Sequence, residues 1–315
     1  MWFKKKPDER PLGVPLDQLQ LGLGATTLKC KRVDDSLVVT HEHFSTTVSV
    51  VSPDAHESNT GPIQAVVQVS TALPTERAAH FQGPIGLVNR FAATGALTAD
   101  GVRRFVGARL TIYEGECGAD NLDVWDLHAQ LLLVAITGAT DALLGGMRVS
   151  MGMEVAKTSP SLWGRRDFEQ VKSQLSRFCV CGSEEDALTA EIGLVGGAVH
   201  STLGHATALW QVEANTHPYL GGGLSCRLSL PHRVPNSEKL ELILLALNKA
   251  EMAPRDLAPH FGAWTLGQTE DNPVYCSFLP NVLHATPGIA MNMSVWAIAR
   301  ARWAHGVLAS IGIAL

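Results

Sequence analysis

Histidine and cysteine are the side chains whose spacing in this sequence best suits metal chemistry. His41 and His43 would lie on one face of a strand, because alternate residues of a strand share a face. Cys179 and Cys181 form the one close cysteine pair. A structural zinc site needs about four ligands, and no second pair lies near either motif in the sequence. We therefore interpret the histidines as an exposed edge pair and the cysteines as ordinary strand residues, and we predict no metal site.

A second group of histidines lies in and after a glycine-rich segment, at His200, His205, His217 and His232. Folding could gather these rings around residues 196–223 and build the active site of an enzyme of unfamiliar type. Their spacing alone does not show such a gathering. We keep this enzyme as an alternative hypothesis.

The signatures of familiar enzymes are missing from the sequence. Gly22 and Gly24 precede two threonines, but a phosphate-binding loop needs a third glycine, a preceding strand and a following helix. No G-x-S-x-G elbow, H-E-x-x-H pair or P-loop occurs. The sequence therefore predicts no catalytic residue and no cofactor, and it leans away from an enzyme.

Tryptophan, tyrosine and arginine near the C-terminus form our candidate partner-binding set, because such side chains carry much of the binding energy at protein interfaces. Trp296 and Trp303 lie seven residues apart on a predicted last helix, with Arg300 on the same face, and Trp264 and Tyr275 lie on predicted strands. Core packing is the ordinary explanation of such a stripe. A cation–π contact inside the fold would explain the arginine equally well.

Length and composition exclude several classes of protein. The chain has 315 residues, more than one domain usually contains, so two domains are expected. Its net charge of −5 argues against a nucleic-acid binder. We interpret the basic cluster Lys4, Lys5 and Lys6 as a solvated end. Six cysteines in so long a chain do not make a disulfide scaffold, and no secretory segment follows the N-terminus. We expect a reducing cytoplasm.

The best candidate for a membrane span is residues 124–147, which are rich in Leu, Ala, Val and Ile. Asp126, His128, Gln130 and Asp141 interrupt it with groups that are costly in lipid. The stretch is typical of a buried helix in a globular domain. We predict no membrane partner.

The clearest local pattern is an α-β-β unit at residues 237–281. Leu240, Ile243, Leu244 and Leu247 recur at helical spacing and indicate one buried stripe. Residues 261–267 and 274–279 are predicted strands, joined by a polar turn. An earlier unit, at residues 84–113, repeats the plan with a helix and strands at 102–106 and 108–113.

The whole chain therefore reads as two similar α+β domains, at residues 13–150 and 165–315. Each is predicted to be an antiparallel sheet packed with helices, in the order helix, three strands, helix, two strands, helix. Leu73 aligns with Leu230 at an offset of 157 residues, and Asn89 with Asn248 at an offset of 159. Trp125 aligns with Trp296. Two generic α+β patterns could match in this way by chance, because few residues are identical; we favour a duplication as the hypothesis.

The middle helices end in Asn89-Arg90 and Asn248-Lys249, and each is followed by a strand pair. In this respect the chain resembles the type III secretion chaperone-like fold and the bacterial YbjN family, which has that fold. The resemblance implies a non-enzymatic, protein-binding or regulatory role built on paired domains. The chain departs from the family pattern in its loop at residues 53–62, its Gly221–Gly223 insertion and its poor first helix.

Our first hypothesis is a chaperone-like or regulatory protein-binding module. Its exposed sheet and helix faces would hold an extended or helical segment of another protein, whose identity the sequence does not give. A structural subunit of a larger assembly is a further alternative, and a homo-oligomer is left open.

Overall fold

A computed structural model describes most of the two predicted domains. The described residues are 14–24, 26–41, 44–51, 63–72, 89–91, 94–100, 103–113, 129–137, 159–195, 206–234, 236–252, 258–267 and 271–313.

The first domain is built on a six-stranded antiparallel sheet. Its strands have the spatial order β1-β2-β3-β4-β6-β5. Helix α1 precedes the sheet, the short 3-10 helix η1 lies between β4 and β5, and residues 129–137 are helical after β6. The bounds are α1 Val14–Gly24, β1 Lys29–Val33, β2 Ser36–Thr40, β3 Ser45–Val51, β4 Ile63–Ala72, η1 Asn89–Phe91, β5 Ala96–Asp100 and β6 Arg103–Tyr113.

The second domain repeats this plan. Its strand order is β7-β8-β9-β10-β12-β11, which is the order of the first sheet element for element. Helices precede the sheet, interrupt it after its fourth strand and follow it. The bounds are α5 Arg165–Leu175, β7 Val180–Ser183, β8 Ala187–Gly193, β9 Thr207–His217, β10 Gly221–Ser229, α6 Ser237–Glu251, β11 Ala263–Leu266, β12 Pro273–Pro280, η2 Asn281–Leu283 and α7 Ile289–Ser310.

The predicted fold class is confirmed: the protein is α+β, with two similar antiparallel sheets. Each sheet has four strands before its middle helical segment, one more than the predicted order. In the second domain the additional strand is β7, for which the strand interpretation of Cys179 and Cys181 was the one prediction. In the first, β5 had no prediction, and the two strands predicted at 102–113 are the single strand β6. Gly107, which separates the two predicted strands, lies within β6, and the end of the Met252 side chain packs close to it.

One cross-strand row can be followed through both sheets at equivalent positions, away from the register shift near Ile63 at the start of β4. Following the pairs across the first sheet from β1 to β5 gives the row Cys30, Val39, Thr46, Thr71, Val106 and Leu97. The same path from β7 to β11 gives Cys181, Ala190, Trp210, Leu228, Tyr275 and Trp264. Thr71 and Leu228 are 157 residues apart, the offset that Leu73 and Leu230 predicted. The two sheets therefore correspond along this row without a register slip.

The aligned asparagines make the same contacts in both domains. The Asn89 side chain accepts a hydrogen bond from the Leu97 N–H at 2.7 Å and donates to the Leu97 carbonyl at 3.1 Å. The Asn248 side chain makes the same two bonds to Trp264, at 2.7 and 2.9 Å. Each asparagine is buried and holds the strand that follows its helix. This shared contact explains why asparagine stands at both positions.

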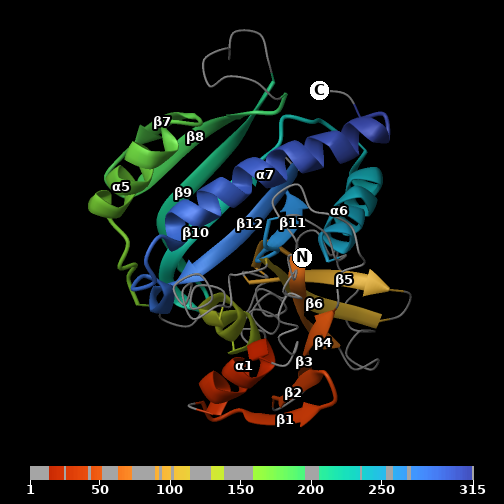
Figure 1. Cartoon of the computed structure of the whole chain (residues 1–315). Helices are drawn as coiled ribbons and strands as arrows, with labels where there is room; N and C mark the ends of the chain where they lie inside the picture. Colours follow the sequence, from red (N-terminus) through yellow and green to blue (C-terminus); the bar gives the residue numbers. More distant parts are fainter. Residues whose placement is uncertain are drawn as a thin grey trace, which may run out of the picture.

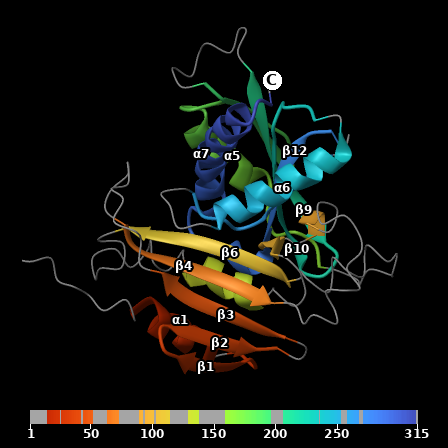
Figure 2. The same ribbon diagram turned by 90° about the vertical axis from the view of Figure 1, so that its right-hand side faces the viewer.

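Helices α5 and α7 cover one face of the second sheet (Figure 1). Burial alternates along β8, where Leu188, Ala190 and Ile192 face inward, as expected for a strand with one covered face. On β9, Trp210 faces α7 and donates its Nε1–H to the Ser294 hydroxyl at 3.0 Å. Figure 2 shows the second domain lying above β4 and β6 of the first sheet.

The start of the second domain is held by a short segment, residues 159–163, that crosses the second sheet. Ser161 donates to the Gly223 carbonyl at 2.7 Å, and Asn281 donates to the Pro160 carbonyl at 2.8 Å. A Cβ on Gly222 would lie 2.0 Å from the Pro160 carbonyl oxygen. Close approach of this segment explains Gly222, whereas Gly223 is crowded by the Leu279 carbonyl of β12 and Gly221 has a φ of +77°. Together these constraints account for the run Gly221–Gly223, which had been a departure from the family pattern.

Candidate functional site

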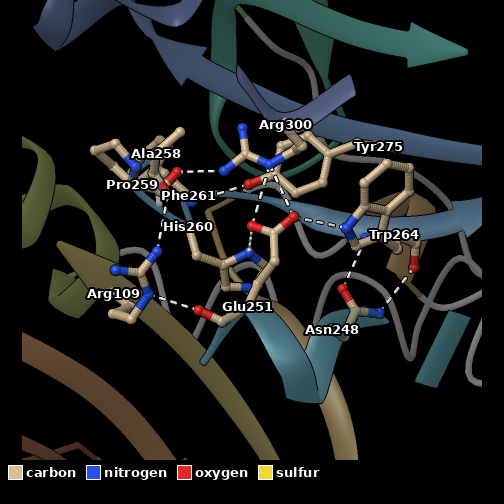
Figure 3. Close-up of polar contacts among 10 residues, drawn as sticks. All are labelled: Arg109, Asn248, Glu251, Ala258, Pro259, His260, Phe261, Trp264, Tyr275 and Arg300. Carbon is tan, nitrogen blue, oxygen red and sulfur yellow. Dashed lines mark hydrogen bonds and ion pairs between the residues drawn. The ribbon is translucent and has the colours of Figure 1, made fainter. Parts of the chain in front are cut away.

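The most concentrated chemistry in the described structure surrounds Glu251, the last residue of α6. Its side chain is fully buried. The carboxylate accepts hydrogen bonds from Trp264 Nε1 at 2.7 Å and from Arg300 Nε at 2.9 and 3.1 Å. His260 Nδ1 lies 2.9 Å from Oε2 (Figure 3). Because a carboxylate only accepts, the His260 proton must be on Nδ1.

Arg300 links this carboxylate to the strands of the second sheet. Its guanidinium lies over the Tyr275 ring, with Cζ 3.9 Å from the ring centroid, a cation–π geometry. It also donates to the Pro259 carbonyl at 2.5 Å. The Tyr275 hydroxyl accepts from the Phe261 N–H at 2.9 Å. The arginine therefore joins α7, the loop after α6 and β12 in one network.

The charges in the network balance each other. Burial by itself raises the pKa of Glu251, but the Arg300 guanidinium and His260 outweigh it and lower that pKa to about 2. Burial lowers the pKa of His260, more than the neighbouring Glu251 raises it. At neutral pH the network thus contains an ionised carboxylate, a guanidinium and a neutral imidazole. His260 Nε2 is buried and has no hydrogen-bond partner among the described residues.

Arg109 of β6 brings the first domain into the same network. Its Nε donates to the Glu251 carbonyl at 2.5 Å, and its Nη2 donates to the Ala258 carbonyl at 2.9 Å. The backbones of Arg109 and His260 exchange two hydrogen bonds, at 2.9 and 2.7 Å. Arg109 itself is fully buried. The loop that carries His260 therefore pairs with the first sheet, and the network lies at the contact between the domains.

Two further contacts cross the same boundary. Gln68 of β4 donates to the Met252 carbonyl at 2.6 Å, and Arg90 donates to the Leu266 carbonyl at 3.1 Å. With these contacts, the end of α6 and the edge strand β11 are both held against the first domain. The arrangement suits a fixed joint between the two domains, because its polar groups are buried and hydrogen-bonded across the boundary.

Three members of the candidate partner-binding set belong to this joint, and their prediction as surface residues is wrong. Trp264, Tyr275 and Arg300 are 0%, 1% and 2% exposed, so a partner cannot reach them. Trp264 and Tyr275 are a cross-strand pair on the covered face of the sheet, and Arg300 points from α7 onto the Tyr275 ring. Trp296 and Trp303 are half-buried and pack against the core from the flank of α7. The cation–π contact inside the fold, which the sequence offered as the other explanation of Arg300, is present.

The described histidines of the second group are not gathered. His217 is the last residue of β9 and pairs with Gly221 at the start of β10, and its Nδ1 accepts from the Tyr219 and Leu220 N–H groups. His232 lies beyond the other end of that strand, about 30 Å away for nine residues at strand rise. Its Nε2 contacts His305 Nδ1 at 3.1 Å, and burial lowers its pKa to about 4. His200 and His205 fall outside the described residues.

The other proposed ligands have ordinary surroundings. His41 is buried, with Nε2 3.0 Å from the Thr46 hydroxyl, so it is not exposed at an edge as predicted. His43 is not among the described residues. Cys179 is buried, which raises its pKa to about 11, and Cys181 lies on β7, so the strand assignment holds for the second cysteine. Within the described ranges, no three metal-ligating side chains group together.

Sequence reasoning did not identify Glu251, His260 or Arg109 as functional residues. One signal was present: Glu251 continues the stripe of Leu240, Leu244 and Leu247, so a carboxylate occupies a core position of an amphipathic helix. Such a residue must be paired when it is buried. The identity of its partners depends on tertiary contacts between α6, α7 and β6, which spacing along the chain does not give.

A different feature is exposed on the outer edge of the second sheet. There β7 follows Phe178, which is 55% exposed, and begins with Val180, which is 51% exposed. Val180 pairs with Glu191, and Glu191 pairs with Leu209 on β9. These three side chains form a row on the face opposite α5 and α7, and all three are exposed. We call Phe178, Val180, Glu191 and Leu209 the β7 surface.

The backbone of β7 is also unpaired on its outer side among the described residues. The Glu184 N–H bonds to the Ala187 carbonyl across the β7–β8 turn. Hydrogen-bonded pairs alternate along an antiparallel ladder, so Gly182 and Val180 bond toward β8. The N–H and C=O groups of Cys181 and Ser183 then point to the free edge. This edge can accept another strand.

No helix among the described residues is both long enough and apolar enough to cross a membrane. No protein-family model, curated protein or solved structure matches the chain. The resemblance to the type III secretion chaperone-like fold and the YbjN family therefore stays a prediction.

Proposed function

We propose that this protein is a non-enzymatic protein-binding module, chaperone-like or regulatory, that holds an extended segment of another protein at the β7 edge. The observation that carries the proposal is the unprotected state of this edge. Natural sheets usually protect their outer strands with lysine, proline or a covering element. β7 instead presents Phe178 and Val180 beside unpaired backbone groups.

The equivalent strand of the first domain supports this assignment. Cys30 of β1 corresponds to Cys181 of β7, so Lys29 and Lys31 correspond to Val180 and Gly182. Both lysines are exposed, and they protect β1 in the usual way. The two copies thus differ at the positions that decide whether an edge strand can accept a partner.

The rest of the molecule suits a rigid support for such an edge. The buried network fixes the second domain on the first. The segment at residues 159–163 fixes the start of the second domain on its own sheet. The five described cysteines are free thiols, which fits the reducing cytoplasm that we propose as its location.

The test is affinity capture from a lysate of the source cells, with quantitative mass spectrometry. The bait is compared with Val180→Lys, which gives β7 the charge of β1, and with Leu242→Lys as a matched control on α6. Leu242 is 67% exposed and distant from β7 in the chain, so its substitution tests the effect of a lysine alone.

We expect at least one protein that is enriched by the wild type and by Leu242→Lys and is lost with Val180→Lys. Equal recovery of every captured protein by all three baits would contradict the β7 edge as the binding site.

A further inference from the structure

The side chains around the β7 edge specify the chemistry of the partner segment. The turn after β7 carries Glu184, Glu185 and Asp186, all exposed, and Glu191 and Glu213 are exposed on the open face of β8 and β9. The basic groups on the open face are Arg177, before β7, and Arg227, which is half-buried on β10. On the α5 side, Lys172 Nζ donates to the Ser183 hydroxyl at 2.9 Å, and that hydroxyl donates to Glu169 at 2.8 Å, so this lysine is matched by a carboxylate. The surface therefore combines apolar side chains with an excess of negative charge.

The spacing along β7 defines what lies opposite each position of an added strand. Val180 and Gly182 face the same side, because alternate residues of a strand share a face. An apolar side chain opposite Val180 would extend the row Val180, Glu191 and Leu209 by one apolar contact. Gly182 has no side chain, so a long residue opposite it can extend across β7 toward Thr189, its partner on β8, whose hydroxyl lies beside Gly182. Glu191 lies diagonally from Gly182 on β8, and the acidic turn follows the end of β7.

We propose that the β7 edge binds an extended protein segment that carries an apolar residue and, two positions away, a lysine or arginine. The apolar residue packs on Val180, and the cation extends over Gly182 toward Glu191 and the Glu184–Asp186 turn. The backbone of the segment bonds to the outward N–H and C=O groups of Cys181 and Ser183, which is recognition by strand addition. This inference rests on the proposed function and adds the class of the partner.

Two other histidine clusters in the molecule give weaker grounds for a ligand site. The pair His232 and His305 brings two ring nitrogens within 3.1 Å of each other, but a metal site needs further ligands that the described residues do not supply. The unpartnered His260 Nε2 lies inside the interdomain joint, with Tyr275, Arg300 and Arg109 around it. Neither carries an inference about a ligand.

The test uses two capped heptapeptides, Thr-Thr-Val-Thr-Lys-Thr-Thr and the same peptide with glutamate in place of lysine. Each is titrated into the full-length ¹⁵N-labelled protein while the amide signals are followed by NMR. The amides of Cys181 and Ser183 report strand addition directly, because they point to the free edge. We expect the lysine peptide to shift both signals and to bind about 5-fold or more tightly than the glutamate peptide at low salt, since exposed charges within a Debye length attract.

Two variants locate the charge preference. Glu191→Gln should reduce the difference between the peptides, whereas Glu238→Gln, an exposed glutamate on α6, should leave it unchanged. The difference should also shrink at about 0.5 M NaCl, where screening is strong.

Each contrary result has its own meaning. Equal binding of both peptides at the Cys181 and Ser183 amides would overturn the charge preference, while strand addition and the proposed function would stand. No shift of these amides with either peptide would overturn strand addition of this class of segment. The proposed function would then be decided by the capture experiment with Val180→Lys alone.

Discussion

β1 and β7 occupy the same place in two sheets of one topology, yet their exposed residues differ in kind. β1 presents Lys29 and Lys31, whereas β7 presents Val180 and Gly182. The two sheets have equivalent outer edges, and among their described residues only β1 has lysines of the kind that disfavour further strand pairing. The two sheets share one strand order, but their edge strands present different side chains. We therefore look for the function where the two domains differ.

The interiors differ as well. Tyr275 and Trp264 of the second sheet correspond by register to Val106 and Leu97 of the first. The offset of 159 that relates the two asparagines places Ala92 at the position of Glu251. The polar network therefore has apolar counterparts in the first copy. The loop from Asn248 to Trp264 is also eight residues longer than the loop from Asn89 to Leu97, and this additional length carries His260 to Arg109.

The largest expected effect comes from removing the charge at the centre of the network. Glu251→Ala should destabilise the protein by about 3–5 kcal/mol, because it leaves Arg300 buried without its carboxylate. Urea denaturation followed by tryptophan fluorescence measures the loss. The double variant Glu251→Ala with Arg300→Met should recover much of it, since the second copy then approaches the apolar first copy at this site. A loss below about 1 kcal/mol for the single variant would mean that the network does not stabilise the joint.

The two asparagines give a matched pair of variants. Asn89→Ala and Asn248→Ala should each cost about 1–3 kcal/mol, because each leaves the N–H and C=O of a buried strand residue unpaired. Similar losses in denaturation experiments would show that the copies share this contact energetically. If only one variant were destabilised, the structural equivalence of the two middle segments would not extend to their energetics.

Gly222→Ala tests the contact between the segment at residues 159–163 and the second sheet. The added Cβ would meet the Pro160 carbonyl at 2.0 Å, so the segment must move and the protein should lose about 1–3 kcal/mol. Gly193→Ala is the control, because a Cβ there meets nothing within 4 Å. Equal midpoints of thermal unfolding for both variants would contradict the close approach of residues 159–161.

Acid should weaken the protein through two buried histidines. Burial lowers the pKa of His260 and lowers that of His232 to about 4, below the usual value of about 6.5 in an unfolded chain. The unfolded chain therefore binds more protons below pH 6.5, and stability falls as the pH falls, by at most about 1.4 kcal/mol per pH unit for each group. Denaturation at pH 7.0, 6.0 and 5.0 measures this decline. His232→Gln and His260→Gln should each make it shallower; unchanged slopes in both would assign it to other groups.

The α-β-β unit of the second domain could be predicted from the sequence because its signals are local. The stripe of Leu240 to Leu247 predicted α6, and the β-rich stretches that bracket a polar turn predicted β11 and β12. Asn248 was recognised as an anchor of the duplication, and its hydrogen bonds to Trp264 explain why.

β5 was not predicted as a strand, and β7 was predicted only through the strand interpretation of its cysteine, without bounds. β7 has four residues, one of them Gly182, and β-sheet pairing with β8 defines it more than its own composition does. The surface assignment of Trp264, Tyr275 and Arg300 failed because the sequence does not show which face of a sheet a later helix will cover. Their burial follows from the position of α7, which only the tertiary structure gives.

Exchanging the two edges tests the central claim most directly. Val180→Lys and Lys29→Val exchange the residues at equivalent positions of β7 and β1. Both positions are exposed, so neither substitution should change the free energy of unfolding by more than about 0.5 kcal/mol. The measurement is retention, by each variant, of the protein captured by the wild type. Our account predicts that Val180→Lys loses it and that Lys29→Val retains it. Retention by Val180→Lys, or loss with Lys29→Val alone, would contradict the assignment of binding to β7.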